Sequence, residues 1–129
     1  MARVHDVLTA MVAALGATGA ATSTALGIEP NITGSDYPLI RVVPAKATPR
    51  KGSGARSLEV LVYFGGKLHD YDGLDSIYAQ MAAMEESIVS ALRSGSGWQA
   101  SHIETLFDGD RLTAYKIAAA RFDVTVTPS

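Results

Sequence analysis

Asp75-Ser-Ile-Tyr-Ala-Gln-Met-Ala-Ala-Met-Glu-Glu-Ser-Ile-Val-Ser-Ala-Leu92 is the most regular stretch of this sequence. Its apolar side chains recur at helical spacing, at Ile77, Tyr78, Met81, Met84, Ile88 and Leu92. Asp72 or Asp75 could serve as the N-cap, and Gly95 follows the far end. The pattern therefore predicts an amphipathic helix over residues 75–92.

Two strand patterns precede this helix. Tyr37 to Val43 is predicted as a strand bounded by Pro44, and Leu58 to Phe64 as a second strand closed by two glycines. The second strand is apolar on both faces, which is typical of a buried strand. The intervening residues 44–57 are rich in Pro, Gly and Ser, so we expect a long, flexible hairpin loop.

Two further strand patterns follow the helix, after a break of Ser and Gly over residues 94–97. His102 to Phe107 is predicted as one strand, and Leu112 to Thr127 as a longer or interrupted one. The turn Asp108-Gly-Asp110 would join them. The run Ala118-Ala-Ala120 in the last strand could be a bulge or a bend.

The first residues of the chain carry a second helical pattern. Its apolar positions are Val4, Val7, Leu8, Met11, Val12 and Leu15, all on one helical face, and Gly16 is a natural stop. The opposite face is small and weakly polar, which would suit a subunit contact. The same stretch could be taken for a secretory signal, but Asp6 and Thr9 interrupt its apolar run. Residues 17–36 show no period and are expected to be irregular.

This order predicts a single α+β domain over residues 1–129. Two helices would pack on one face of a mainly antiparallel four-stranded sheet, in the order α-β-β-α-β-β. A composition of 47% hydrophobic and 19% charged residues describes a globular protein. No stretch approaches the roughly 18 apolar residues that a membrane span needs.

Composition and the absence of known motifs also limit the reactions and ligands that this chain could support. The chain has no cysteine, so it has no disulfide and no thiolate metal site, and its net charge of −2 does not indicate a wholly basic nucleic-acid surface. No nucleophile elbow, phosphate-binding loop or dinucleotide fingerprint is present. Ser101 and His102 are neighbours along a strand and would point to opposite faces. We therefore expect no enzyme activity, no cofactor and no metal.

The densest polar cluster is His69-Asp70-Tyr71-Asp72, with Asp75 close behind. Its carboxylates could hold a divalent cation, but the cluster lacks the alternation and closing Glu of a calcium loop. The simpler interpretation is a solvated turn that leads into a helix whose first turn favours acidic residues. Asp70, Asp72 and Asp75 are also a candidate acidic partner surface.

The strongest local signal is basic. Lys46, Arg50, Lys51 and Arg56 carry four positive charges with no acid between them, which leaves −6 on the rest of the chain. The loop could be merely solvated, could contact an acidic surface on a neighbouring subunit, or could contact nucleic-acid phosphates. Separate sites of opposite sign can dock head to tail in a ring.

These patterns together resemble the tail terminator proteins of long-tailed bacteriophages, also called tail completion or minor tail proteins. The resemblance spans nearly the whole chain. It rests on the two helices, the strands Asp36-Tyr-Pro-Leu-Ile-Arg-Val-Val43 and Leu58-Glu-Val-Leu-Val-Tyr-Phe-Gly65, and the closing pair of strands. It is carried by element order and hydrophobicity, since the family has no catalytic signature.

The resemblance implies a homo-hexameric ring that caps the tail tube, ends its polymerisation and offers a joining surface to the head completion protein. Phage DNA would pass through the opening, and the protein would be part of the virion tail, assembled in the host cytoplasm without a membrane. Two alternatives remain: another head-tail connector or tail tube subunit, and a small binding module or enzyme unrelated to phage.

Overall fold

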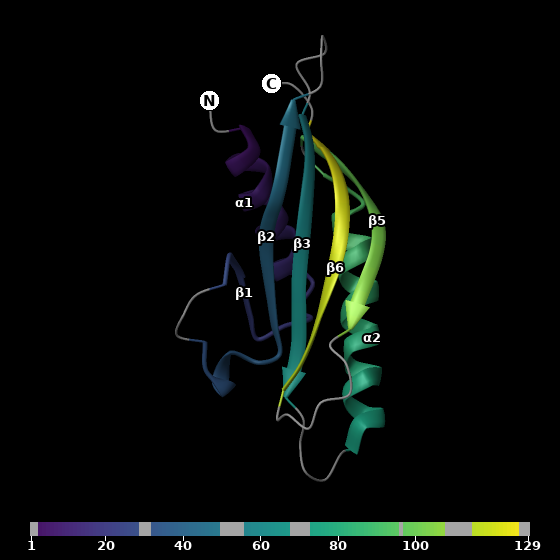
Figure 1. Ribbon diagram of the computed structural model, residues 1–129. Helices are drawn as coiled ribbons and strands as arrows, with labels where there is room; N and C mark the ends of the chain where they lie inside the picture. Colours follow the sequence, from purple (N-terminus) through teal and green to yellow (C-terminus); the bar gives the residue numbers. More distant parts are fainter. Residues whose placement is uncertain are drawn as a thin grey trace.

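The computed structural model describes residues 3–28, 32–49, 56–67, 73–95, 97–107 and 115–126. In chain order its elements are α1 (Arg3–Ala17), β1 (Ser23–Leu26), the 3-10 helix η1 (Gly34–Asp36), β2 (Leu39–Pro49), β3 (Arg56–Lys67), α2 (Gly73–Leu92), β4 (Ser94–Gly95), β5 (Trp98–Phe107) and β6 (Tyr115–Val126). Figure 1 shows the sheet in front and both helices behind it.

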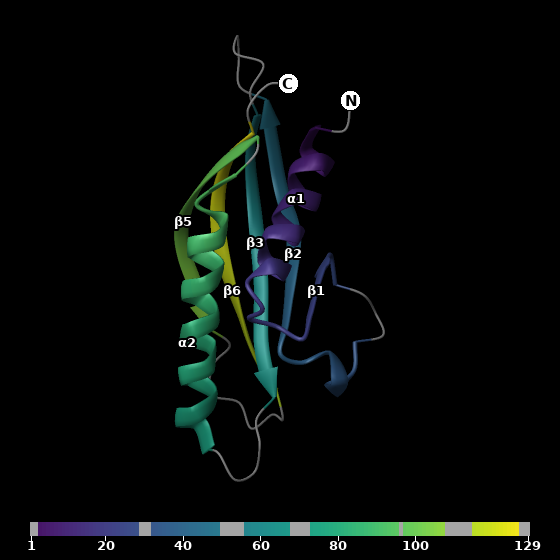
Figure 2. The same cartoon turned by 180° about the vertical axis from the view of Figure 1, so that it is seen from behind.

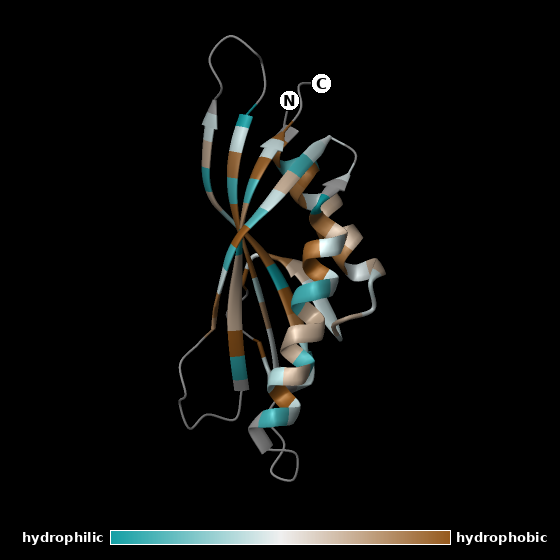
Figure 3. Cartoon of the chain, turned by 90° about the vertical axis from the view of Figure 1, so that its right-hand side faces the viewer, coloured by the Kyte–Doolittle hydropathy of each residue, from teal (hydrophilic) through white to brown (hydrophobic). Residues whose placement is uncertain are grey.

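The described strands form one six-stranded sheet in the order β1-β2-β3-β6-β5-β4. Every pairing is antiparallel except that of β1 with β2. Figure 2 and Figure 3 show α1 and α2 on the same face of this sheet. The predicted α+β class with a mainly antiparallel sheet is confirmed, but the four-stranded order α-β-β-α-β-β is wrong, because β1 and the two-residue β4 extend the sheet.

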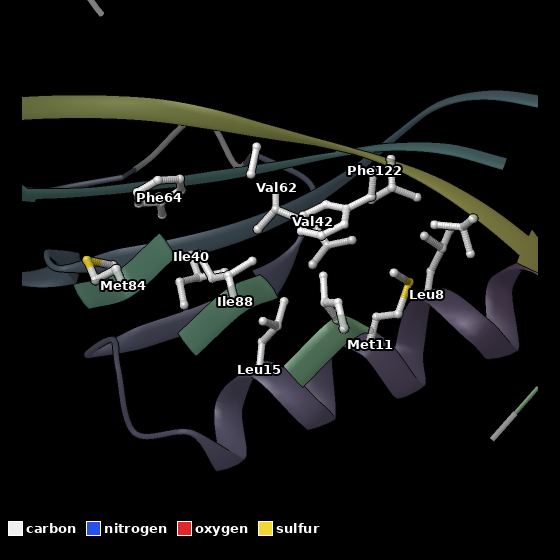
Figure 4. Packing of buried hydrophobic residues seen from close by; sticks show 14 of the residues in the cluster. Leu8, Met11, Leu15, Ile40, Val42, Val62, Phe64, Met84, Ile88 and Phe122 are labelled. Carbon is white, nitrogen blue, oxygen red and sulfur yellow. The ribbon is translucent and has the colours of Figure 1, made fainter. Parts of the chain in front are cut away.

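One hydrophobic core fills the space between the helices and the sheet (Figure 4). The helices contribute Val7, Leu8, Met11, Leu15, Ile77, Met81, Met84, Ile88 and Leu92. Facing them from the central strands are Ile40, Val42, Leu58, Val60, Val62, Phe64 and Phe122. Burial of each such side chain stabilises the fold by roughly 1.5–3 kcal/mol. The helical members are those that the sequence period selected, so both amphipathic faces are confirmed.

Both helices differ from the prediction at one end. α1 continues through Gly16 to Ala17, and the chain leaves it at Gly19, whose φ is 69°. A positive φ is readily adopted by glycine alone, so Gly19 is the better stop signal. α2 begins at Gly73, so Asp75 lies in its first turn and is not the N-cap; Asp72 lies outside the described residues.

Two close approaches fix α2 against the sheet. A Cβ added at Gly66 of β3 would lie 2.7 Å from Ile77 Cδ1 and would also collide with the Gln80 side chain. At the other end, Trp98 Nε1 donates a hydrogen bond to the Leu92 carbonyl at 3.0 Å. The first contact sets the spacing of helix and sheet, and the second ties the end of α2 to the start of β5.

The β2–β3 hairpin is longer than predicted. β2 passes through Pro44 to Pro49, and β3 starts at Arg56, so the described parts of the expected 44–57 loop are strand. The register shifts between Pro44 and Lys46 and leaves a bulge there. β1 pairs only as far as Val42, so Pro44 lies on an edge, where its missing N–H disturbs no neighbouring strand.

β1 corrects the expectation that residues 17–36 are irregular. Ser23–Leu26 pairs with Leu39–Val42, and the Gly27 N–H donates to the Val42 carbonyl at 2.8 Å. Arg41 supports this pairing, because its buried guanidinium donates to the Ser23 carbonyl at 3.0 Å. β1 is stabilised by its pairing with β2, and its four residues show no alternation of polar and apolar side chains that could have predicted a strand.

The last strand, β6, is continuous. Every residue of β6 from Tyr115 to Val126 pairs in register with β3, so the alanine run 118–120 forms no bulge on that side. The irregularity lies instead in β5, where the register shifts between His102 and Glu104. β5 also begins at Trp98, four residues before the predicted start.

Candidate interaction surfaces

The structure places two of the four predicted basic residues. Lys46 lies on β2 and Arg56 at the start of β3, and both are exposed; Arg50 and Lys51 lie outside the described residues. Lys46 is opposite Glu59 in the strand register. The positive charge of Lys46 therefore projects from a paired strand beside an acid, and not from a free loop.

The predicted acidic surface is represented by Asp75, which is exposed in the first turn of α2; Asp70 and Asp72 lie outside the described part of the chain. Figure 1 shows the start of α2 and the Pro49–Arg56 end of the hairpin at opposite ends of the molecule. The described members of the two groups, Lys46, Arg56 and Asp75, are therefore not brought together within one chain. A contact between them would need a second copy.

A charged cluster occupies the face of the sheet that carries no helix. Arg121 Nε lies 3.0 Å from Glu59 Oε1, in a charge contact without hydrogen-bond alignment. Arg121 Nη1 lies 3.6 Å from Glu104 Oε2. One guanidinium thus links β3, β6 and β5, and the acids compensate its charge, so the cluster is not a free anion site.

A shallow hollow surrounds this cluster, with a volume of about 440 Å³. Its lining residues are Lys46, Thr48, Ser57, Leu58, Glu59, Ile103, Arg121, Phe122 and Asp123. The charges of both signs alternate around it, and no buried polar group points into it from the described elements except the Arg121 Nε already in contact with Glu59. The hollow therefore has the character of a contact surface more than of a reaction site.

His102 does not form a catalytic pair with Ser101. In the register Ser101 is opposite Asp123 and His102 is opposite Phe122, so they lie on different faces. His102 Nε2 is 2.7 Å from Thr105 Oγ1, and its ring lies 5.3 Å from that of Phe122. Within the described ranges, no three His, Asp or Glu side chains lie close enough to hold a metal ion.

Exposed apolar side chains form two groups at the edges of the sheet. We call Ile103, Leu106 and Phe107 the β5 edge patch; their side chains are 54%, 60% and 49% exposed. We call Leu26 and Ile28 the β1 corner; they are 40% and 57% exposed. These residues were not among the predicted sites, because alternation along a strand cannot show which edge lacks a neighbour.

The β5 edge patch lies on a strand with a free side. β4 pairs only with Trp98 and Gln99, and the Ala100 N–H donates to the Arg93 carbonyl at 2.9 Å. From Ser101 to Phe107, no described strand lies beyond β5. The bulge between His102 and Glu104 also brings Ile103 to the surface.

An apolar hollow of about 400 Å³ adjoins this patch. It is lined by Tyr63, Leu106, Phe107, Ile117, Ala118 and Ala119. Its walls come from β3, β5 and β6, and none of these side chains is charged. The hydropathy colouring in Figure 3 shows apolar residues along the strands as well as in the helices. An unpaired edge with an apolar recess is a surface that can accept another protein surface.

Neither the collection of protein-family models nor the curated proteins searched contains a match to this chain. Among the described residues, neither helix combines the length and the apolar character that a membrane crossing requires.

Proposed function

We propose that this chain is a structural virion protein of a long-tailed bacteriophage, a tail terminator that caps the tail tube as a ring. The ring would be a homo-hexamer that ends tube polymerisation and presents a joining surface to the head completion protein. DNA would pass through its centre. The protein would need no cofactor and would catalyse no reaction.

The observation that carries this proposal is the free edge of β5. A monomeric protein usually protects an edge strand, because its unpaired N–H and C=O groups are a template for another chain. Here Ser101–Phe107 is unprotected by any described strand and carries three exposed apolar side chains. Such a surface suits a subunit that is buried in an assembly. The two helices and four long strands follow one another in the order on which the resemblance to tail terminators rests.

The assembly state of the purified protein tests the first half of the proposal. Light scattering and electron microscopy should show six-fold rings at high protein concentration. A strict monomer would contradict the ring. Long tubes would instead identify a tail tube subunit, since the same edge could serve that polymer.

A test in the phage addresses the second half. Removal of the gene should give tails longer than normal, and the purified protein should stop the growth of tail tubes in solution. Tails of normal length in the deletion would reject the terminator role. A gene position between head completion and tail tube genes is also expected.

The basic residues are proposed to contact a neighbouring subunit or the DNA. Neutralisation of Lys46, Arg50, Lys51 and Arg56 by Gln should weaken ring assembly or DNA retention, with the largest effect at low salt. A single-charge control, Arg93→Gln, removes one exposed positive charge just after the end of α2. Unchanged assembly and phage titre in the fourfold variant would remove these residues from the proposal.

A further inference from the structure

We infer that copies of this chain join head to tail, with the β5 edge patch of one copy packed against the β1 corner of the next. The inference rests on the proposed ring and names the two surfaces that would build it. The occupant of the β5 edge is thus a second copy of this chain.

The first argument is the distribution of apolar surface. All large hydrophobic side chains that are exposed in the described residues belong either to the β5 edge patch or to the β1 corner. The two groups lie at opposite edges of the sheet. A two-fold contact would cover one group and leave the other in water, whereas a head-to-tail contact covers both in every copy.

The second argument is the level of the two groups along the strands. Successive pairings connect Leu26, Val42, Val62, Ala120 and Thr105 across the sheet. Leu26 is therefore at the same position along the strands as Thr105. Since Thr105 lies between Ile103 and Leu106, the β1 corner is level with the β5 edge patch. Two copies that meet through surfaces at the same level can be related by a rotation alone, without a shift along the rotation axis. A closed ring requires this relation.

The third argument is charge. Lys46 is exposed at the edge of the sheet that carries β1, and Glu104 is exposed at the β5 edge. Each already lies beside an opposite charge, since Lys46 is opposite Glu59 in the register and Glu104 Oε2 lies 3.6 Å from Arg121 Nη1. These charges therefore do not oppose a head-to-tail contact.

The fourth argument is area and shape. A large apolar side chain presents roughly 200 Å² when fully exposed, so the five about half-exposed side chains offer on the order of 500 Å². Specific interfaces bury roughly 1,200–2,000 Å² in total, so these residues can form the apolar centre of one. The hollow of about 400 Å³ beside Leu106 and Phe107 provides a recess for the side chains of the corner.

A mixing experiment tests the inference. The edge variant is Leu106→Glu with Phe107→Glu, and the corner variant is Leu26→Glu with Ile28→Glu. Each alone should sediment at the monomer mass of 13.5 kDa. An equimolar mixture should form a species of twice that mass and grow no further, because each variant supplies the one surface that the other lacks.

Two controls keep the experiment interpretable. Ala82→Glu with Ala83→Glu adds the same two charges at exposed positions of α2 and should assemble like the wild type. Circular dichroism should show that every variant is folded. If a glutamate variant does not fold, Leu106→Ala with Phe107→Ala and Leu26→Ala with Ile28→Ala replace the pair, each weakening association at least about tenfold, as expected for hot-spot residues.

A corner variant that dimerises alone would overturn the inference, because its β5 edge would then pair with itself. A mixture that stays monomeric while the wild type assembles would also overturn it and would leave the proposed function intact. A wild type that is itself a strict monomer would instead contradict the proposed ring.

Discussion

The two edges of the sheet that no described strand covers differ in their construction. Beyond Val42, the edge of β2 carries two prolines, an exposed lysine and a bulge. Beyond Ala100, the edge of β5 carries Ile103, Leu106 and Phe107, and its bulge exposes an isoleucine. Proline and lysine are means by which proteins prevent strands from pairing at an edge, and only the β2 edge carries them, whereas both edges carry a bulge.

This difference indicates that one edge is protected from other chains and the other is available to them. If both edges were protected from pairing with other chains, the protein would be expected to stay monomeric. If both edges were open to pairing, uncontrolled association would be favoured. A single available edge, with a complementary corner beside the protected one, limits growth to one direction.

The largest effect is expected at a phenylalanine inside the fold. Phe122 on β6 is 1% exposed and belongs to the core, so Phe122→Ala should lower the free energy of unfolding by about 3–5 kcal/mol. Urea denaturation followed by circular dichroism measures this loss. A change below about 1 kcal/mol would mean that the core is not packed as described.

Phe107 offers the matched substitution at the β5 edge. Since its side chain is 49% exposed, Phe107→Ala should lower the unfolding free energy of the monomer by only about 1–2 kcal/mol. It should nevertheless weaken self-association about tenfold or more, measured by sedimentation. Equal association of Phe107→Ala and wild type would show that this edge is not an interface.

The β2 edge should associate with other copies when the residues that protect it are replaced. Pro44→Val combined with Lys46→Val restores an N–H donor and removes a charge, so we expect association beyond that of the wild type by roughly 1 kcal/mol, or about fivefold. Light scattering would detect the larger species. Thr48→Val is a control on the open face of the same strand and should leave the mass distribution unchanged. If both variants behave alike, Pro44 and Lys46 have no protective role.

The smallest effect is expected in the charged cluster between the edges. Arg121→Met removes contacts to Glu59 and Glu104 on a partly exposed face, so the cost should be below about 1 kcal/mol. Thermal unfolding at low and high salt measures it, and the wild-type advantage should shrink at high salt. A salt-independent loss of several kcal/mol would assign the cluster a structural role that its exposure does not suggest.

The sequence was sufficient for the elements whose signal is local. The helical spacing of Met81, Met84 and Ile88 predicted α2, because burial of one face imposes that period. The four long strands were also found, although their ends were not. Pro44 was taken as a strand end, and only the sheet order shows that it lies on an edge, where proline is tolerated.

The interaction surface was less accessible to sequence reasoning. Lys46 was identified by charge alone, without its strand or its neighbour Glu59. Ile103, Leu106 and Phe107 were recognised only as part of a strand, because the bulge shifts the alternation and the free edge depends on which strand lies next to β5. Edge position is a property of the whole sheet, and no local pattern encodes it.

The mass of the wild-type assembly is the most direct test of the account. Sedimentation equilibrium at increasing concentration should show the 13.5 kDa monomer converting to a closed species, with six copies as the expected number. The species should not grow further when the concentration is raised, since a head-to-tail ring leaves no free β5 edge. A protein that remains monomeric at every concentration would contradict the account.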